Sequence, residues 1–373
     1  MHRPKNRALG IALGSAAAGG LVLAGAASAS AAPLANSGSA LGYVYTSSNS
    51  TSGNQVQVFS RNADGTLTAA GTYNTGGTGT GASGFSQGAV TLSPDKGTLL
   101  VVDAGSNQVS DFAVLPSGVL KLRNVTASGG ILPTSVAIHD GIAEVLNAGG
   151  TANVTGFRAT ENGLVPIARS SQPLSAAASS PEDVAISPDD SHVVVTEKNS
   201  NTIDTFALSS KGALAPAVTS PSDSPLAFAE VFTPSGQLLV ADDGANGTSA
   251  VSSYQVGSSG TLSATQAAVS DGQSATCWIA TGQNGNTFVD NAGSGTISSY
   301  QVSPSGRVTF LGNTSAGTGA KPLDNAVSSD GRDLYVLDSN NHQLAEFSVG
   351  ANAQLTTVGT QALPAGSAGV AAS

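Results

Sequence analysis

Two acidic residues and one lysine occupy positions from which they could carry out hydrolytic chemistry. Glu182 follows Pro181 at the start of one β-rich run, and Glu197-Lys198 lies at the end of the next run. A carboxylate such as Glu182 or Glu197 can act as a general base on water. Lys198 could then stabilise an oxyanion that develops on a carbonyl group. We therefore predict Glu182, Glu197 and Lys198 as candidate catalytic residues.

Other residues with suitable chemistry share these positions at the start of one run or the end of the following one. The candidate substrate-binding residues are Asp183, Asp103, Trp278 and Asp324, and Asp242, Asp243 and Asp338 lie at equivalent places. Each of these candidate residues could instead have a purely structural role. Acidic residues in turns often cap backbone amides, the Glu197-Lys198 pair is compatible with a surface ion pair, and a tryptophan can simply pack between sheets.

No spacing of residues predicts a metal or a cofactor. Asp189-Asp190 and Asp242-Asp243 supply the hard oxygen ligands of calcium, but they lack the spaced acidic pattern of a calcium-binding loop. No Cys/His grouping is typical of a zinc site. We predict no cofactor and no metal site, with calcium as the one compatible ion. Cys277 is the only cysteine, so no intrachain disulfide can form.

The elements that must position these residues are short strands that recur with a fixed period. An aromatic residue followed by a turn of the form Gly-x-Leu, with variants, occurs seven times, at Phe59, Phe112, Phe157, Phe206, Tyr254, Tyr300 and Phe347. The spacings of 53, 45, 49, 48, 46 and 47 residues, with four short runs in each unit, are typical of propeller blades. The sequence therefore predicts an all-β, seven-bladed β-propeller.

The two ends of the repeat predict how the ring closes. The first unit starts at residue 41 with a run that corresponds to a second strand, and no inner strand precedes it. Residues 363–371 resemble an inner strand with nothing after it. We expect the first blade to be closed by strands from both termini, since this leaves no open junction between the first and last blades.

The first 31 residues have the pattern of a secretory signal peptide. Arg3, Lys5 and Arg7 precede an apolar stretch, and small residues lead up to Ala31. We predict a signal peptide over residues 1–31 with cleavage near Ala31, a short linker over 32–40 and the propeller over 41–373. The protein is then expected to be secreted and, after cleavage, to have no membrane segment; a transmembrane anchor is the alternative.

Charge limits the class of partner. Without residues 1–31 the chain has 11 basic and 24 acidic residues, a formal charge of −13. Nucleic acids and anionic lipid surfaces are bound through basic patches, so we expect neither as a partner. We expect a monomer.

Several segments of the repeat resemble the bacterial seven-bladed β-propeller lactonase family, which includes 6-phosphogluconolactonases and carboxymuconate-lactonising enzymes. They are residues 193–206, 225–232, 277–280 and 291–300, and the resemblance covers nearly the whole chain after residue 31. The resemblance implies a seven-bladed fold and hydrolysis or isomerisation of a lactone in the central funnel. The partner that it implies is a small-molecule lactone or a carbohydrate-like ligand.

The chain departs from that family at the funnel. Family enzymes carry a Pro-His pair at the start of an inner strand, whereas this chain has Pro133-Thr134, Pro181-Glu182, Pro225-Leu226 and Pro322-Leu323. No cluster of arginines is available to clamp a phosphate group, so we do not expect a phosphorylated sugar lactone. The alternative to a lactonase-like enzyme is a noncatalytic, secreted propeller that binds a ligand or a protein.

Overall fold

The computed structural model describes residues 40–83, 87–176, 179–244 and 248–373. The predicted signal peptide and all of the predicted linker except Ala40 lie outside the described residues. Among the described residues, no helix is long and apolar enough to cross a membrane.

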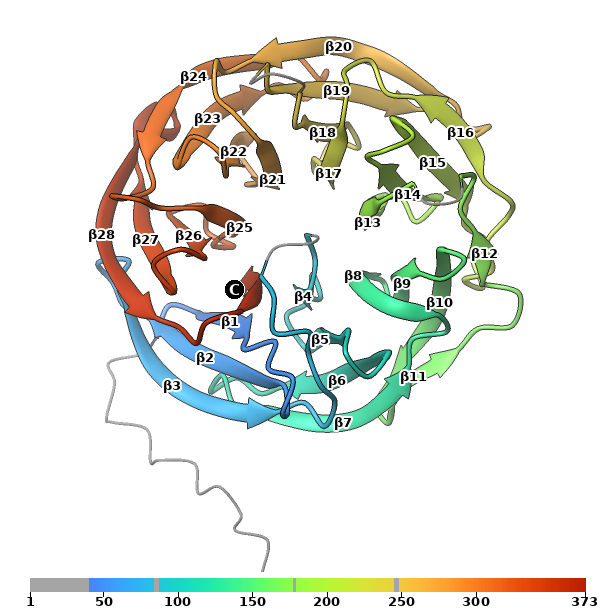
Figure 1. The fold of residues 1–373 in the computed structure, drawn as a ribbon, viewed down its shortest axis with the longest axis horizontal. Coiled ribbons are helices and arrows are strands. Elements are labelled where there is room, and N and C mark those ends of the chain that lie inside the picture. Colours follow the sequence, from blue (N-terminus) through green and yellow to red (C-terminus); the bar gives the residue numbers. More distant parts are fainter. Residues whose placement is uncertain (1–39, 84–86, 177–178, 245–247) are drawn as a thin grey trace, which may run out of the picture. The chain divides into compact units, whose positions relative to one another are not determined.

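The described strands form seven antiparallel sheets arranged as blades around a central axis (Figure 1). The predicted seven-bladed all-β propeller is confirmed. In each blade the inner strand is followed outwards by the second, third and outer strands. The short runs rich in Val, Leu, Ile and Thr form the second and third strands, whose burial on both faces favours β-branched and apolar residues.

The strand bounds follow the repeat. The first three blades consist of β29 (Ala368–Ala372), β1 (Tyr43–Ser47), β2 (Gln55–Arg61) and β3 (Leu67–Asn74); β4 (Val90–Leu92), β5 (Thr98–Asp103), β6 (Gln108–Val114) and β7 (Leu120–Ala127); and β8 (Ile131–His139), β9 (Ile142–Gly149), β10 (Asn153–Thr160), β11 (Gly163–Pro166) and β12 (Gln172–Pro173).

The fourth and fifth blades consist of β13 (Pro181–Ile186), β14 (His192–Glu197), β15 (Thr202–Ala207) and β16 (Val218–Pro221); and β17 (Ala227–Phe232), β18 (Leu238–Asp242), β19 (Ala250–Val256) and β20 (Leu262–Ser270). The last two consist of β21 (Thr276–Thr281), β22 (Asn286–Asn291), β23 (Thr296–Val302) and β24 (Val308–Ser315); and β25 (Pro322–Val327), β26 (Asp333–Asp338), β27 (Gln343–Val349) and β28 (Leu355–Ala362), with the 3-10 turn η2 at Ala351–Ala353.

The recurring aromatic residue occupies the third strand of every blade and is buried in each. The seven residues are Phe59, Phe112, Phe157, Phe206, Tyr254, Tyr300 and Phe347. A large ring at this position fills the space between neighbouring sheets, so its burial contributes to the contact between blades. This explains why the aromatic residue kept its place in the sequence period.

In six blades the glycine of the following turn has a positive φ, which explains why glycine occurs there. Gly65, for example, has φ 84°, a left-handed conformation that other residues adopt at a cost. In the seventh blade Asn352 and Ala353 take φ 55° and 54° within η2. The left-handed turn geometry is therefore retained although the glycine is not.

The outer strand of the fourth blade begins later than the repeat indicates. In other blades it follows the turn glycine directly, whereas here Leu214 forms an isolated bridge with Leu208 and β16 begins at Val218. Pro216 lies between these positions. Because proline has no backbone N–H to donate, it interrupts the strand ladder at this place.

The ring closes as predicted, with the last strand paired to the first. β29 is hydrogen-bonded to β1 with Val44 opposite Ala372 and Tyr45 opposite Ala371. Ser373 reinforces the end of this pair, because its N–H donates to the Tyr43 carbonyl at 2.9 Å and its Oγ accepts from the Tyr43 N–H at 2.7 Å.

A buried arginine ties the closing blade to the seventh blade. Arg61 at the end of β2 has a fully buried side chain and forms an ion pair with Asp333 at 2.6 Å and one with Asp330 at 3.0 Å. Its Nη1 also donates to the Ser373 carbonyl at 2.8 Å. Arg61 therefore joins β2, β26 and the C-terminal residue at the junction where the ring closes.

We expect Arg61→Met to lower the free energy of unfolding by about 3–5 kcal/mol, since breaking a buried pair leaves the Asp333 charge uncompensated. Denaturant unfolding measures this difference. Arg158→Met is the matched control, because Arg158 is exposed and its guanidinium donates to the Lys211 carbonyl at 3.1 Å. If Arg158→Met lost as much stability as Arg61→Met, the proposed role of the buried Arg61 ion pairs would be contradicted.

Candidate functional site

The predicted site residues lie on one face of the ring. All inner strands run in the same direction, so the start of each inner strand and the connection between its second and third strands lie at the same end of the blade. Glu182 is in β13, Lys198 follows β14, and Trp278 is in β21. This face is called the inner-strand-start face below.

Glu182 is a buried carboxyl group with a raised pKa. Its residue is 6% exposed, and its Oε1 accepts a hydrogen bond from Ser180 Oγ at 2.9 Å. Burial raises the pKa of Glu182 to about 7, against the opposing effects of the Ser180 hydrogen bond and the Lys198 charge. A carboxyl group with this pKa is divided between its acid and base forms near neutral pH, which suits proton transfer.

Lys198 lies close enough to Glu182 to influence its charge, and it is held by a neighbouring blade. Its Nζ forms an ion pair with Asp243 Oδ2 at 2.8 Å. Burial lowers the pKa of Lys198, but the hydrogen bond and charge of Asp243 outweigh burial and hold the pKa above its usual value. The lysine is therefore a fixed positive charge beside a carboxyl group that titrates.

Two aromatic rings extend this cluster into the fifth and sixth blades. Lys198 Nζ lies 4.7 Å from the centre of the Phe228 ring, a cation–π contact. The Phe228 and Trp278 rings pack with centroids 4.9 Å apart at 59°. Trp278 Nε1 is buried and has no hydrogen-bond partner among the described residues. We call Glu182, Lys198, Asp243, Phe228 and Trp278 the carboxylate–lysine cluster.

Cys277 is close to this cluster but is not suited to nucleophilic attack. It is buried, and burial together with the Asp243 charge raises the pKa of its thiol well above the usual value. The thiolate is the reactive form of cysteine, and a raised pKa keeps the group protonated near neutral pH. The chemistry of the cluster is therefore that of the carboxyl group and the lysine.

Glu197 is adjacent to Lys198 in sequence but faces a different environment. Its Oε1 accepts a hydrogen bond from Ser175 Oγ at 3.0 Å, and its carboxyl group lies beside that of Asp204. Burial and the Asp204 carboxyl raise the pKa of Glu197 to about 7. The structure therefore does not bring Glu197 together with Glu182, although both carry a titratable carboxyl group.

Asp183 lies at the axis of the ring and binds backbone amides. Each inner strand is the edge of its sheet nearest the axis. The N–H groups on its unpaired side therefore need acceptors. Asp183 Oδ1 accepts from Ser135 Oγ and from the Val184 N–H, both at 2.8 Å, and Oδ2 accepts from the Glu230 N–H at 3.2 Å. These bonds connect the third, fourth and fifth blades. Burial raises the pKa of Asp183 to about 7.

Asp324 does the same at the junction of the seventh and first blades. Its Oδ1 accepts from the Asn325 N–H at 2.8 Å and its Oδ2 from the Val370 N–H at 3.1 Å. Burial and the charge of Asp290 raise the pKa of Asp324 well above its usual value. The contacts of Asp183 and Asp324 are thus those of residues that satisfy inner-strand edges.

Asp103 joins the first and second blades. Its Oδ1 accepts from Asn54 Nδ2 at 2.9 Å and Thr75 Oγ1 at 2.7 Å, and its Oδ2 accepts from Ser110 Oγ at 2.6 Å. At the equivalent place, Asp242 accepts from Ser252 Oγ at 2.6 Å. Each of these carboxylates lies at the end of a second strand and accepts from a serine on the third strand of its own blade. Asp103 also accepts from two residues of the first blade.

Gln87 extends across the centre of the ring to backbone groups of the fifth and sixth blades. Its Oε1 accepts a hydrogen bond from the Ile279 N–H at 2.7 Å, and its Nε2 donates to the Glu230 carbonyl at 3.5 Å. The residue leads into the second blade, whereas its partners belong to the sixth and fifth blades. One side chain therefore reaches across the centre of the propeller.

A cavity of about 320 Å³ opens on the inner-strand-start face. Its lining is largely apolar and includes Ala82, Ala89, Val102, Leu132, Pro133 and Ala368. Thr134 also lines this cavity. The next residue, Ser135, donates a hydrogen bond to Asp183, which follows Glu182 in the sequence. A second cavity, of about 430 Å³, lies where the inner strands end, and Gln87, Asp183 and Glu230 contribute to it.

Sequence reasoning missed the contacts that cross between blades. Asp243 and Phe228 complete the cluster around Lys198, yet each lies on the next blade along the chain. Asp243 is singled out by the sequence, but its ion pair with Lys198 is not. The repeat period is the signal that could have paired them, since Asp243 follows Lys198 by 45 residues, a spacing that also occurs between aromatic residues of the repeat. Residues one period apart lie at the same place on neighbouring blades.

Comparisons with known proteins agree with this architecture. Residues 43–163 match the sequence model of the family described as lactonase, 7-bladed beta-propeller. No curated protein matches the chain.

Among solved structures, the periplasmic gluconolactonase of Pseudomonas aeruginosa is 17% identical, with a TM-score of 0.70 over 88% of this chain and 98% of that one. A functionally unknown protein from Desulfotomaculum acetoxidans is 15% identical, with a TM-score of 0.69 over 89% and 98%. Virginiamycin B lyase from Staphylococcus aureus is 15% identical, with a TM-score of 0.55 over 75% and 86%. At these identities the likeness is one of fold.

Proposed function

We propose that this chain is a member of the seven-bladed β-propeller lactonase family that hydrolyses an uncharged lactone at the carboxylate–lysine cluster. The observation that carries the proposal is that Lys198, held by Asp243 at 2.8 Å, acts electrostatically on Glu182, whose pKa burial raises to about 7. A base poised near neutral pH beside a fixed cation is what hydrolysis of an ester bond requires. The family match over residues 43–163 supports the choice of a cyclic ester.

The proposed reaction uses water as the nucleophile. The Glu182 carboxylate accepts a proton from water as the oxygen attacks the lactone carbonyl carbon, and the carbonyl oxygen becomes an oxyanion beside Lys198. The ring C–O bond then breaks, and protonated Glu182 returns its proton to the departing alkoxide. The product is the open-chain hydroxy acid, and Glu182 is ionised again.

Charge argues for an uncharged substrate. Lys198 is the cation of the cluster, and its charge is already balanced by Asp243 and Glu182. A phosphorylated lactone would need further positive groups, typically arginines that bind phosphate through two hydrogen bonds. The apolar cavity on the same face suits the uncharged part of a lactone ring or its substituent.

Activity is expected to rise with pH through about 7. Because Glu182 acts as a base, it must be deprotonated, and its raised pKa of about 7 means that activity is lost as the pH falls through this value. The measurement is the initial rate of hydrolysis for a panel of five- and six-membered lactones, from about pH 5 to about pH 9, after subtraction of spontaneous hydrolysis. No turnover of any lactone, or a rate independent of pH, would contradict the proposal.

A noncatalytic binding protein is the second candidate, favoured by how the other acidic residues are used. Asp103, Asp183 and Asp324 are engaged by donors from the chain itself, which leaves Glu182 and Lys198 with little support from further polar groups. Calorimetric binding of a lactone without its hydrolysis would favour this candidate.

We also propose that the protein acts as a monomer outside the cytoplasm. The signal-peptide pattern of residues 1–31 supports export. N-terminal sequencing of the protein collected from its host, with Ala32 expected as the first residue, tests the export, and gel filtration tests the monomer.

A further inference from the structure

We propose that His139, Asp140 and Asp190 form a site for one divalent transition-metal ion, of the zinc type, on the face where the inner strands end. The inference is independent of the lactonase proposal, because these residues lie at the opposite end of the inner strands from Glu182. Each residue can offer one ligand atom, and these atoms lie within 4.8 Å of one another.

The site is built from the same turn in two neighbouring blades. His139 is the last residue of β8 and Asp140 begins the turn into β9, whereas Asp190 lies in the turn between β13 and β14. His139 and Asp190 are 51 residues apart, a separation within the range of the blade repeat. The repeat therefore places ligands that are distant in sequence side by side in space.

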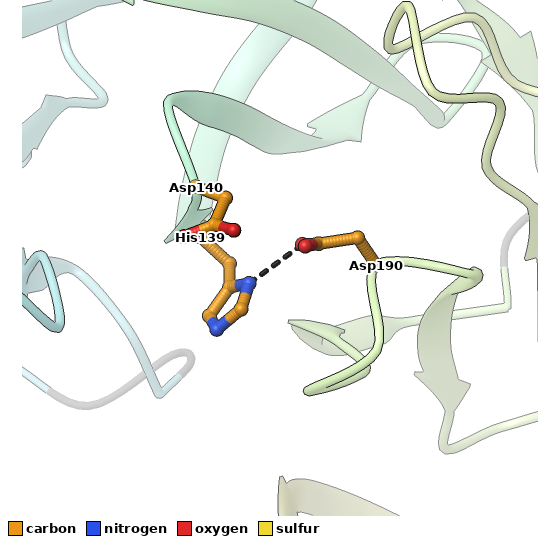
Figure 2. A group of neighbouring side chains, drawn as sticks. All are labelled: His139, Asp140 and Asp190. Atoms are coloured by element: carbon orange, nitrogen blue, oxygen red, sulfur yellow. Dashed lines mark hydrogen bonds and ion pairs between the residues drawn. The ribbon is translucent and has the colours of Figure 1, made fainter.

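The three groups converge in the structure. His139 Nδ1 lies 2.6 Å from Asp190 Oδ1, and the carboxyl group of Asp140 points towards that of Asp190 (Figure 2). The side chains of His139 and Asp190 are 26% and 34% exposed, so solvent and ions can reach them. In a tetrahedral zinc site, ligand atoms are about 3.3 Å apart, so modest side-chain rotations complete the geometry.

Charge favours a cation here. Among the described residues, neither Asp140 nor Asp190 forms an ion pair with a lysine or arginine, and Arg123, which lines the same groove as Asp140, is bound to Asp111 at 2.9 Å. Two carboxylates that point at each other beside an imidazole form a site where a divalent ion removes the repulsion. Without an ion, the contact between His139 and Asp190 is a single hydrogen bond between partly exposed side chains.

The ligand types select the class of metal. An imidazole nitrogen with two carboxylates suits zinc and neighbouring transition metals, whereas calcium takes six to eight oxygen ligands. Three protein ligands leave a further position for water. This site was not predicted from the sequence, where no Cys/His grouping was found, because its histidine and one of its carboxylates belong to different repeats.

A bound ion would link the turns of the third and fourth blades. Its expected effects are binding of one zinc ion per chain and a rise in Tm of a few degrees at saturating zinc, since a ligand that binds only the folded state stabilises it. Both are to be measured on untagged full-length protein freed of metal by a chelator, by calorimetric titration with zinc chloride and by thermal unfolding. Cobalt(II) provides an absorption spectrum that reports tetrahedral coordination.

The variants His139→Ala and Asp190→Asn are expected to weaken zinc binding by about 100-fold or more and to lose the shift in Tm. Asparagine tolerates the left-handed backbone of Asp190, whose φ is 55°, so this variant keeps the turn. His342→Ala is the matched control, because His342 is an exposed histidine between β26 and β27 at the other end of the blades.

Binding that is lost in the two cluster variants and retained in His342→Ala would support the site. No binding of zinc, unchanged binding in His139→Ala, or loss in His342→Ala would overturn it. Because none of these measurements uses a lactone, failure of the metal site and failure of the lactonase proposal are distinguishable.

Discussion

Replacing Glu182 by glutamine is expected to lower kcat for lactone hydrolysis by about 10²–10⁴-fold, the range that general base catalysis contributes. Glutamine keeps the shape of the side chain and can still accept the hydrogen bond that Ser180 donates at 2.9 Å. It cannot accept a proton from water. The fold and the cation beside it should be unchanged, so the loss should be confined to the chemical step.

Glu197→Gln is the matched control, because Glu197 is also a buried glutamate with a pKa raised to about 7. Its carboxyl group faces Ser175 and Asp204 instead of the carboxylate–lysine cluster. We expect Glu197→Gln to keep kcat within about twofold of the unaltered protein, since proton transfer does not pass through it.

Equal losses in the two variants would show that burial of a carboxyl group, and not its position, matters for activity. Full activity in Glu182→Gln would remove Glu182 as the base. The inflection of the pH profile near 7 should also disappear in Glu182→Gln and persist in Glu197→Gln.

Deleting residues 367–373 is expected to lower Tm by about 10 °C or more. The deletion removes β29, whose Val370 and Ala371 are buried, and leaves the edge of β1 unpaired. It also removes the carbonyl of Ser373, which accepts from Arg61, and the N–H of Val370, which donates to Asp324. Together these losses amount to about 5 kcal/mol, which gives a shift of this size.

A circular permutant tests whether the strand itself or its covalent position matters. Ala372 of β29 lies opposite Val44 of β1, so a short turn can join residue 373 to residue 42. The new termini are placed in the turn near Ala365, which is exposed. We expect this permutant to melt close to the unaltered protein. A truncated chain that melts like the full chain would contradict closure by β29.

The ring was predictable from the sequence because its period is marked by a residue that packing requires. Phe206 and Tyr254, for example, occur at the same point of neighbouring blades, and both are buried on the third strand. The closing blade was predictable for a related reason, since a unit that lacks an inner strand must find one elsewhere. Pro216, in contrast, shortened a strand in a way that the repeat alone did not indicate.

The site was less predictable, because its geometry depends on directions of side chains. Glu182 and Asp183 are neighbours on β13, and successive side chains of a strand point to opposite sides. Asp183 therefore lies among the amides at the axis, whereas Glu182 lies near Lys198. Glu197 and Lys198 separate in a similar way, and this could not be seen from their position at the end of a run.

The pairing of β29 with β1 also determines an order of folding. It joins residues 330 positions apart, whereas hairpins within a blade close loops of a few residues. Closing a loop of that length costs roughly 3–4 kcal/mol more chain entropy than closing a five-residue turn. The hairpins of the individual blades should therefore form first and the ring should close last. The junction that Arg61 stabilises, between the closing blade and the seventh blade, is then also the place where the ring first opens. The rate of that opening would set the lifetime of the folded protein.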